Sequence, residues 1–252
     1  MINILMSGCN GKMGQVISRL LGKFDDMKIA AGFDIYDSGK NSYPVFSNLD
    51  YCNLKLDVII DFSNPDALDT ILKFAILKKL PIVIATTGIS QSQRNLMEET
   101  AKTIPVFFSA NMSLGINLLL DLVKKAAKIL AANFDIEIIE KHHNQKLDAP
   151  SGTALAIADS INSILEQKQE YIYDRHSRRK KRSKSEIGIH AIRGGTIVGE
   201  HSVVFAGNDE IIEINHSAMS KDIFGAGALR AARFICKKTA GLYSMSDLLS
   251  EE

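Results

Sequence analysis

The chain has 252 residues, of which 46% are hydrophobic and 23% charged, and its formal net charge is +1. This balance is typical of a soluble globular protein and excludes a globally basic nucleic-acid binder. Three scattered cysteines argue against a disulfide framework, and the N-terminus lacks the basic region of a signal peptide. The sequence contains no run of eighteen apolar residues, the length needed to span a membrane. We therefore expect a cytoplasmic protein with neither nucleic-acid nor membrane partners.

The first part of the chain alternates short apolar runs with segments of helical periodicity. We predict strands at 2–6, 28–34, 57–63, 81–88 and 104–113, and helices at 11–24, 65–79 and 90–102. A βαβα order with short connections predicts a parallel sheet covered by helices on both faces.

The pattern changes after residue 114. A helix at 115–130, a strand at 135–142 and a helix at 151–167 precede three candidate strands without intervening helices, at 186–194, 196–207 and 210–218. Asn208 and Asp209 fit a hairpin turn between the last two strands, and such a series predicts a mixed sheet in a second domain. A final helix, 222–238, is expected to close the chain and pack back on the first domain. We therefore expect an α/β fold with two domains. The first would comprise residues 1–113 together with 222–252, and the second would comprise residues 114–221.

A glycine-rich loop, residues 8–14 (GCNGKMG), follows the first strand and opens the first helix. Glycine at such a turn lets the backbone approach a pyrophosphate, whose charge then faces the N-terminus of the helix. Asp34 ends the second strand, twenty residues beyond Gly14, where a carboxylate accepts hydrogen bonds from an adenosine ribose. The context predicts a Rossmann-like dinucleotide-binding domain, although the spacing is G-x-x-G-x-x-G and a plain α/β turn is the alternative.

The preferred coenzyme depends on the residues around Asp34. Its carboxylate disfavours the 2′-phosphate of NADPH, and Ile35 offers no cation. Lys12 and Lys40 could pair with a phosphate, so NADH and NADPH both stay open, with NADH preferred. Two loops that follow later strands, 85–88 and 109–112, are candidates to frame the nicotinamide, and ordinary loop chemistry is their alternative.

Proton carriers and anion donors are concentrated in residues 140–154, EKHHNQKLDAPSGTA. His142 and His143 are neighbours, so on a strand they point to opposite faces, and no H-E-x-x-H motif or cysteine cluster accompanies them. We therefore expect no metal site, and a structural histidine pair is the alternative to a catalytic one. Positive surroundings would help Lys146 to release its proton.

Ser151, Gly152 and Thr153 open a helix after Pro150 and offer backbone N–H groups and two hydroxyls to a carboxylate. Proton donors beside such an anion cradle suit an acidic substrate that is protonated during the reaction. Together with a dinucleotide fold, they predict hydride transfer to an unsaturated acid. Residues 175–184 hold seven Lys and Arg and no acid, which indicates either a solvated mobile loop or a loop that folds over an anionic ligand.

The run EIIEKHHNQKLDAPSGTA resembles the signature of the dihydrodipicolinate (4-hydroxy-tetrahydrodipicolinate) reductase family of lysine and diaminopimelate biosynthesis. GCNGKMG, DFSNP, ATTG, SANMSLGIN, IVGEHSVVFAG and GLYSMSDLL resemble further segments of that family, so the resemblance covers essentially the whole chain. It implies NAD(P)H-dependent reduction of a small dicarboxylate, a C-terminal substrate domain whose mixed sheet forms a homotetramer, and a hinge that closes over substrate.

The resemblance also implies a role for each matched residue. His142 and Lys146 would be the catalytic proton donors, and the substrate would contact His143, Ser151, Gly152 and Thr153. The coenzyme would bind to Gly8, Cys9, Asn10, Gly11, Lys12, Met13, Asp34, Ala85, Thr86, Thr87, Ser109, Ala110, Asn111 and Met112.

Three positions depart from the family pattern: Ile35 and Lys221 stand where members often carry Arg, and Ala85 replaces a Gly. Two other functions are alternatives to the reductase. One is a dehydrogenase acting on aspartate semialdehyde or homoserine, and the other is a non-catalytic dinucleotide sensor that binds nucleic acid through its basic loop. The H-H-x-x-K run argues against both, and the lack of a cysteine in a catalytic-looking loop argues against the dehydrogenase.

Overall fold

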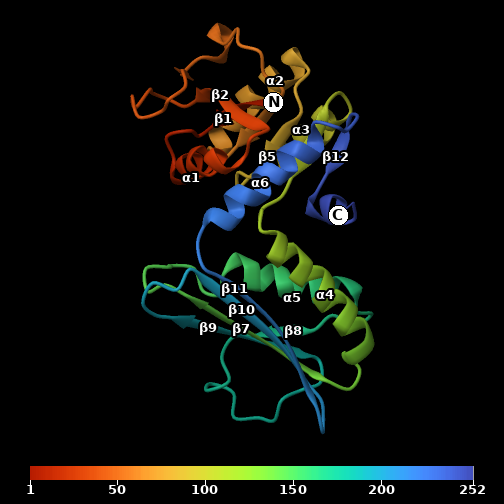
Figure 1. The fold of residues 1–252 in the computed structure, drawn as a ribbon. Helices are drawn as coiled ribbons and strands as arrows, with labels where there is room; N and C mark the ends of the chain where they lie inside the picture. Colours follow the sequence, from red (N-terminus) through yellow and green to blue (C-terminus); the bar gives the residue numbers. More distant parts are fainter. Residues whose placement is uncertain (252) are drawn as a thin grey trace. The chain divides into compact units, whose positions relative to one another are not determined.

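The computed structural model describes residues 1–251, and the chain divides into two compact units (Figure 1). Unit 1 contains residues 1–114 and the chain from residue 222 onward, and unit 2 contains residues 115–221. Within the described residues, no helix is long and apolar enough to cross a membrane.

Unit 1 is built on a parallel sheet with the strand order β12-β6-β5-β4-β1-β2-β3. Its strands are β1 (Ile2–Ser7), β2 (Met27–Phe33), β3 (Val45–Phe46), β4 (Val58–Asp61), β5 (Ile82–Ile84), β6 (Pro105–Phe108) and β12 (Gly241–Tyr243). Its helices are α1 (Lys12–Leu20), α2 (Leu68–Lys78), α3 (Gln91–Ala101), α6 (Asp222–Ile235) and α7 (Met245–Leu249).

Both faces of this sheet are buried, because successive side chains of a strand point to opposite faces. On β1, Ile4 and Met6 join a core cluster that includes Leu229 of α6, whereas Leu5 joins a second cluster that includes Ile71 of α2. This double burial explains why the strands are nearly continuous apolar runs. The predicted parallel sheet with helices on both faces is confirmed, as is the packing of the 222–238 helix on the first domain.

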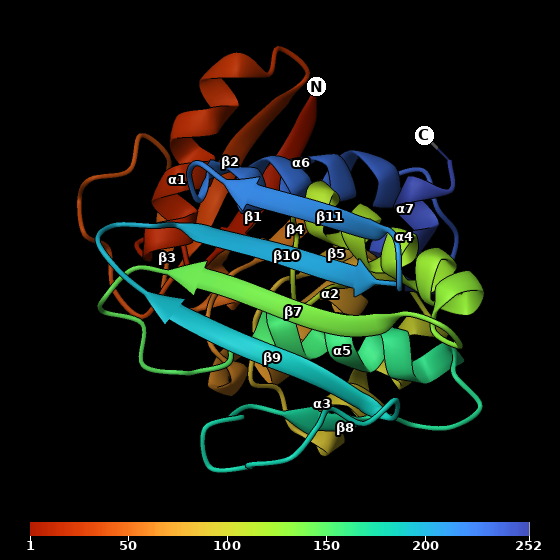
Figure 2. The same ribbon diagram turned by 90° about the horizontal axis from the view of Figure 1, so that it is seen from below.

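Unit 2 is built on a mixed sheet with the strand order β11-β10-β7-β9-β8. Strand β7 pairs antiparallel with β10 and parallel with β9. The strands are β7 (Asp135–His142), β8 (Glu170–Ile172), β9 (Glu186–Arg193), β10 (Gly199–Ala206) and β11 (Ile211–Ala218). Helices α4 (Leu114–Leu130) and α5 (Gly152–Ile164) pack on one face of the sheet, which Figure 2 shows from the strand side. The predicted mixed sheet and its hairpin between β10 and β11 are confirmed.

The elements that sequence periodicity missed are short. Strands β3, β8 and β12 span two or three residues, which is too few to display an alternating pattern. The prediction that helix 222–238 closes the chain is wrong, because α6 ends at Ile235 and is followed by β12 and α7. A capping box formed by Ser244 and Asp247 starts α7 and is its signal in the sequence.

Candidate active site

The glycine loop makes a tight turn between β1 and α1 in unit 1. Gly8 has a φ of +77°, and a Cβ there would lie 2.6 Å from the carbonyl oxygen of Phe62. A side chain at this position would be strained and would also clash, so glycine is required. The Gly11 N–H donates to the Gly8 carbonyl at 3.0 Å and closes the turn. Cys9 is fully buried, and its side chain belongs to a core cluster of unit 1.

Asp34 lies beside this loop at the end of β2. One of its oxygens accepts a hydrogen bond from the Asn10 N–H at 2.9 Å, and the other accepts from the Ile35 N–H at 2.9 Å. The Asn10 side chain donates to the Tyr36 carbonyl, so the loop and the chain after β2 are tied together. The structure thus brings Asp34 to the glycine loop, while Ile35 is 85% exposed.

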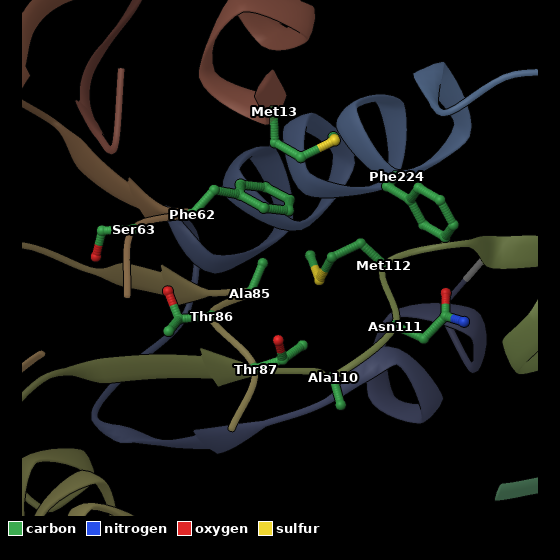
Figure 3. Close-up of a pocket in the computed structure, with 10 residues that line it drawn as sticks. All are labelled: Met13, Phe62, Ser63, Ala85, Thr86, Thr87, Ala110, Asn111, Met112 and Phe224. Carbon is green, nitrogen blue, oxygen red and sulfur yellow. The ribbon is translucent and has the colours of Figure 1, made fainter. Parts of the chain in front are cut away.

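A cavity of about 360 Å³ opens in unit 1 at the carboxyl ends of β4, β5 and β6 (Figure 3). Of the residues that sequence reasoning assigned to the coenzyme, those lining it are Met13, Ala85, Thr86, Thr87, Ala110, Asn111 and Met112. The cavity is also lined by three residues that the sequence pattern did not assign to the coenzyme site: Phe62, Ser63 and Phe224. Phe224 comes from α6, more than a hundred residues after the loops it joins, so no local pattern could place it here.

A buried carboxylate, Asp61, connects two loops of this cavity. It accepts hydrogen bonds from the Ser63 hydroxyl and from the Thr86 hydroxyl, each at 2.6 Å. Burial raises the pKa of Asp61, and the two hydroxyl bonds oppose that effect. The side chain of Thr86 therefore serves to hold the wall of the cavity in place.

The histidine and lysine run lies in unit 2, at the end of β7. Side chains at alternate positions of β7 are buried, and His142 belongs to the buried set with Ile136, Ile138 and Glu140. The ring Nδ1 of His142 lies 2.6 Å from a carboxylate oxygen of Glu140, so Nδ1–H donates to Glu140. His143 lies just after β7 and is half-buried.

Glu140 is fully buried and gathers donors from several elements. Arg193 of β9 donates to both of its oxygens, at 2.7 and 2.8 Å, and the Ser151 N–H donates at 3.0 Å. Burial acts to raise the pKa of Glu140, but the hydrogen bonds from Arg193 and His142 outweigh it and hold the pKa below its usual value. The strand register brings Arg193 to Glu140, because Arg193 is the partner of His142 in the β7–β9 ladder.

Ser151 joins this cluster to the start of α5. Its hydroxyl accepts a hydrogen bond from the Ala154 N–H at 3.2 Å and caps the helix. The same hydroxyl lies 3.2 Å from Nε2 of His201, a buried residue of β10 whose register partner on β7 is Glu140. Gly152 and Thr153 form the first turn of α5, the part of a helix suited to an anion.

Lys146 lies on the loop after β7, with its N–H bonded to the His143 carbonyl at 3.1 Å. Its ammonium group is 2.8 Å from the carboxylate of Asp148, whose carbonyl accepts a hydrogen bond from Arg193 at 2.7 Å. The ionic partner of Lys146 in unit 2 is thus a carboxylate, whereas the sequence predicted cationic surroundings for this lysine.

The basic segment 175–184 is fixed to the sheet of unit 2. Arg175 pairs with Glu137 and Glu186 at 2.8 and 3.0 Å, and Arg182 pairs with Glu137 at 3.0 Å. Arg182 also donates to carbonyls of β7 and β9. Both alternatives drawn from the sequence missed this arrangement, because the acids that neutralise these arginines lie on other segments.

Burial of His201 makes the stability of the fold depend on pH. Burial, aided by the nearby His142, lowers the pKa of His201 from its ordinary value of 6.5 to about 4. Between these two values the unfolded chain binds a proton that the folded chain does not, so stability falls as pH falls. We expect the unfolding free energy to drop by about 2 kcal/mol from pH 7.5 to pH 5.

Urea denaturation at several pH values measures this drop. The His201→Gln variant is the comparison, because it keeps a hydrogen-bonding side chain but has no titratable ring. Its unfolding free energy should vary less over the same interval, and a slope equal to that of the wild type would contradict the assignment to His201.

In the part of the chain that the structure describes, no group of three His, Cys, Asp or Glu side chains is arranged to hold a metal ion.

The chain matches two family models over most of its length. Residues 2–112 match the N-terminal model of dihydrodipicolinate reductase, and residues 115–249 match the C-terminal model.

Individual relatives agree with these models. The chain is 52% identical over 255 residues to the 4-hydroxy-tetrahydrodipicolinate reductase of Caldanaerobacter subterraneus subsp. tengcongensis, covering 100% of this chain and 99% of the relative. It is 50% identical to the reductase of the same name from Clostridium tetani, covering 99% and 98%. A structure of dipicolinate-bound dihydrodipicolinate reductase from Paenisporosarcina sp. TG-14 superimposes with a TM-score of 0.82 at 25% identity, covering 97% of each chain.

Proposed function

The chain belongs to the dihydrodipicolinate reductase family, and on that premise we propose that it reduces 4-hydroxy-tetrahydrodipicolinate to tetrahydrodipicolinate with NAD(P)H. The protein is an oxidoreductase of lysine and diaminopimelate biosynthesis. The observation in unit 2 that carries this function is the cluster in which His142, Glu140 and Ser151 join a proton donor to the N-terminus of α5.

Unit 1 is proposed to bind the nicotinamide coenzyme. Its residues fit this group, because Gly8 adopts a φ that only glycine tolerates well, Asp34 lies beside the loop, and the cavity continues from it along the carboxyl edge of the sheet. The bound coenzyme supplies the hydride. The chain supplies a backbone cradle for the pyrophosphate, a carboxylate for the ribose, and an apolar wall of Met13, Met112 and Phe224 that excludes water.

Unit 2 is proposed to bind the dicarboxylate substrate and to provide its proton. Gly152, Thr153 and the Ser151 cap would hold one carboxylate at the start of α5, with His143 as a further contact. Lys146 and His142 would deliver the proton to the reduced ring. The printed title of the Paenisporosarcina structure names dipicolinate, a planar dicarboxylate, as the bound ligand, which supports this substrate class.

The preference for NADH is proposed from Asp34 and the exposed Ile35. A cation at position 35 would pair with a 2′-phosphate, so Ile35→Arg should lower the KM for NADPH about tenfold, the value of one charge-assisted hydrogen bond. The KM for NADH should change less than about twofold. Steady-state kinetics with both coenzymes, with Ile35→Gln as the uncharged control, measures this. An equal change for both coenzymes would contradict the placement of Ile35 beside the ribose.

Assembly and location are also proposals. Helices α4 and α5 cover one face of the unit 2 sheet, and the other face carries exposed apolar residues such as Ile192, which is 47% exposed. We propose that this face packs against other copies in a homotetramer, which sedimentation would reveal as four times the chain mass. A cytoplasmic location, expected for a biosynthetic enzyme of this kind, is tested by cell fractionation.

The reductase function is tested by adding substrate formed in situ from pyruvate and aspartate semialdehyde, with the synthase present. Coenzyme absorbance should fall only when both precursors and the protein are supplied. A sensor would bind NADH without consuming it and would bind DNA more weakly as salt rises.

A further inference from the structure

Glu140 contacts three separate parts of the proposed substrate site. Its carboxylate accepts hydrogen bonds from the His142 ring, from Arg193 and from the backbone of Ser151 at the start of α5. Arg193 in turn donates to the carbonyl of Asp148, the residue that pairs with Lys146. One buried ion pair therefore contacts the histidine, the anion cradle and the lysine loop.

The bond to Glu140 determines which ring nitrogen of His142 can exchange a proton. An ionised carboxylate only accepts, so Nδ1 must carry its hydrogen, and the second nitrogen, Nε2, gains and loses the other proton. The ring has room because β10 has glycine at position 199: a Cβ there would lie 3.1 Å from Nε2. A side chain at residue 199 would press on this nitrogen.

Arg193 controls how strongly Glu140 acts on the ring. A bare buried carboxylate 2.6 Å from Nδ1 would hold the ring in its charged form and keep its proton. The guanidinium, bound through both carboxylate oxygens, offsets that charge. Glu140 can then orient the ring while Arg193 keeps the proton available for transfer.

We propose that Glu140 and Arg193 are positioning residues with opposite influences on His142: Glu140 fixes its tautomer and favours its charged form, and Arg193 limits that effect. This inference rests on the proposed function only in naming His142 as a proton donor. The charge balance itself concerns the folded protein and is measurable without turnover.

The other titratable groups around the ring come from each neighbouring element. His201 of β10 stacks edge-on with His142 at a centroid distance of 5.3 Å, with His216 of β11 as its own ladder partner. Lys146 and Asp148 lie on the following loop. Helix α5 contributes the neutral Ser151, and α4 contributes apolar residues, including Ile116 and Leu119, to this side of the sheet. None of these residues is altered in the variants compared below.

The first test replaces Glu140 with glutamine, which keeps the shape and removes the charge. We expect kcat/KM to fall by about 10–100-fold, because an oriented imidazole loses its carboxylate partner. The pH profile should have a limb on which activity is lost as His142 deprotonates. The midpoint of this limb should move about one pH unit lower. Glu99→Gln, which alters an exposed pair with Lys102 in unit 1, is the matched control and should leave the profile unchanged.

The second test uses Arg193→Met, which should move the same limb about one pH unit higher, because Glu140 is then unopposed. In the double variant with Glu140→Gln, the limb should lie above that of Glu140→Gln alone, because the unpaired guanidinium of Arg193 no longer disfavours the protonated ring. If Arg193→Met alone does not fold, the comparison of Glu140→Gln with the double variant decides, since the double variant must have the higher midpoint of the two. A purely structural pair would lower activity in each variant without opposite shifts, and that result would overturn the proposal.

The same midpoints are measured in the resting protein by NMR of ¹³C-labelled histidine, with the His142 signal identified by its loss in His142→Gln. Opposite shifts of this signal without any reductase turnover would preserve the charge balance and refute only the proposed function. Turnover without opposite shifts would refute the charge balance and preserve the proposed function.

Discussion

Replacing Lys146 with alanine is expected to lower kcat by roughly 10²–10⁴-fold, the range for losing a general acid. The Lys146 side chain is 22% exposed, and its ammonium group is paired with Asp148, on the loop that follows His142. It therefore has the exposure to reach a substrate and a carboxylate that holds it in position. Steady-state kinetics with substrate formed in situ measures the effect.

Two controls separate lost chemistry from lost structure. Lys102→Ala removes an exposed lysine whose partner is Glu99 on α3, and it should leave kcat unchanged. The unfolding free energy of Lys146→Ala should stay within about 1 kcal/mol of the wild type, because its partner Asp148 is 59% exposed and an ion pair open to solvent contributes little. A Lys146→Ala variant that keeps full activity would remove Lys146 from the mechanism.

Replacing Arg193 with methionine is expected to lower the unfolding free energy by about 3–5 kcal/mol at neutral pH. The cause is Glu140, which is fully buried and would keep its charge without the bidentate partner. Removing both charges, in Glu140→Gln with Arg193→Met, should recover most of this loss, because no buried charge is then left unpaired. Urea denaturation of the three variants measures the differences.

Arg178 offers a matched control in the same unit. It pairs with Glu170 at 3.1 Å, but the two side chains are 40% and 60% exposed. Arg178→Met should therefore cost less than about 1 kcal/mol. If Arg193→Met cost no more than this control, the buried pair would contribute no more to stability than an exposed one.

Part of the site was predictable because it depends on local sequence. The period of two along β7 places Glu140 and His142 on one face, and the loops at the carboxyl ends of parallel strands meet at one edge. Glu140 could have been found in this way, since it precedes His142 by two residues.

The partners of Glu140 could not be found from local sequence. Arg193 reaches it, and His201 reaches the hydroxyl of the neighbouring Ser151, through the register of β7 with β9 and β10, and register depends on how the whole sheet pairs. The basic segment shows the same limit. A count of its charges could not reveal that Glu137, some forty residues earlier, neutralises Arg175 and Arg182.

The most direct test of the central claim is transfer of deuterium. Purified protein would receive substrate formed from pyruvate and aspartate semialdehyde, together with NADH carrying deuterium at both C4 positions, and the product would be analysed by mass spectrometry. We expect coenzyme consumption and one deuterium in tetrahydrodipicolinate. A folded protein that binds NADH but neither consumes it nor labels the product would contradict the reductase function.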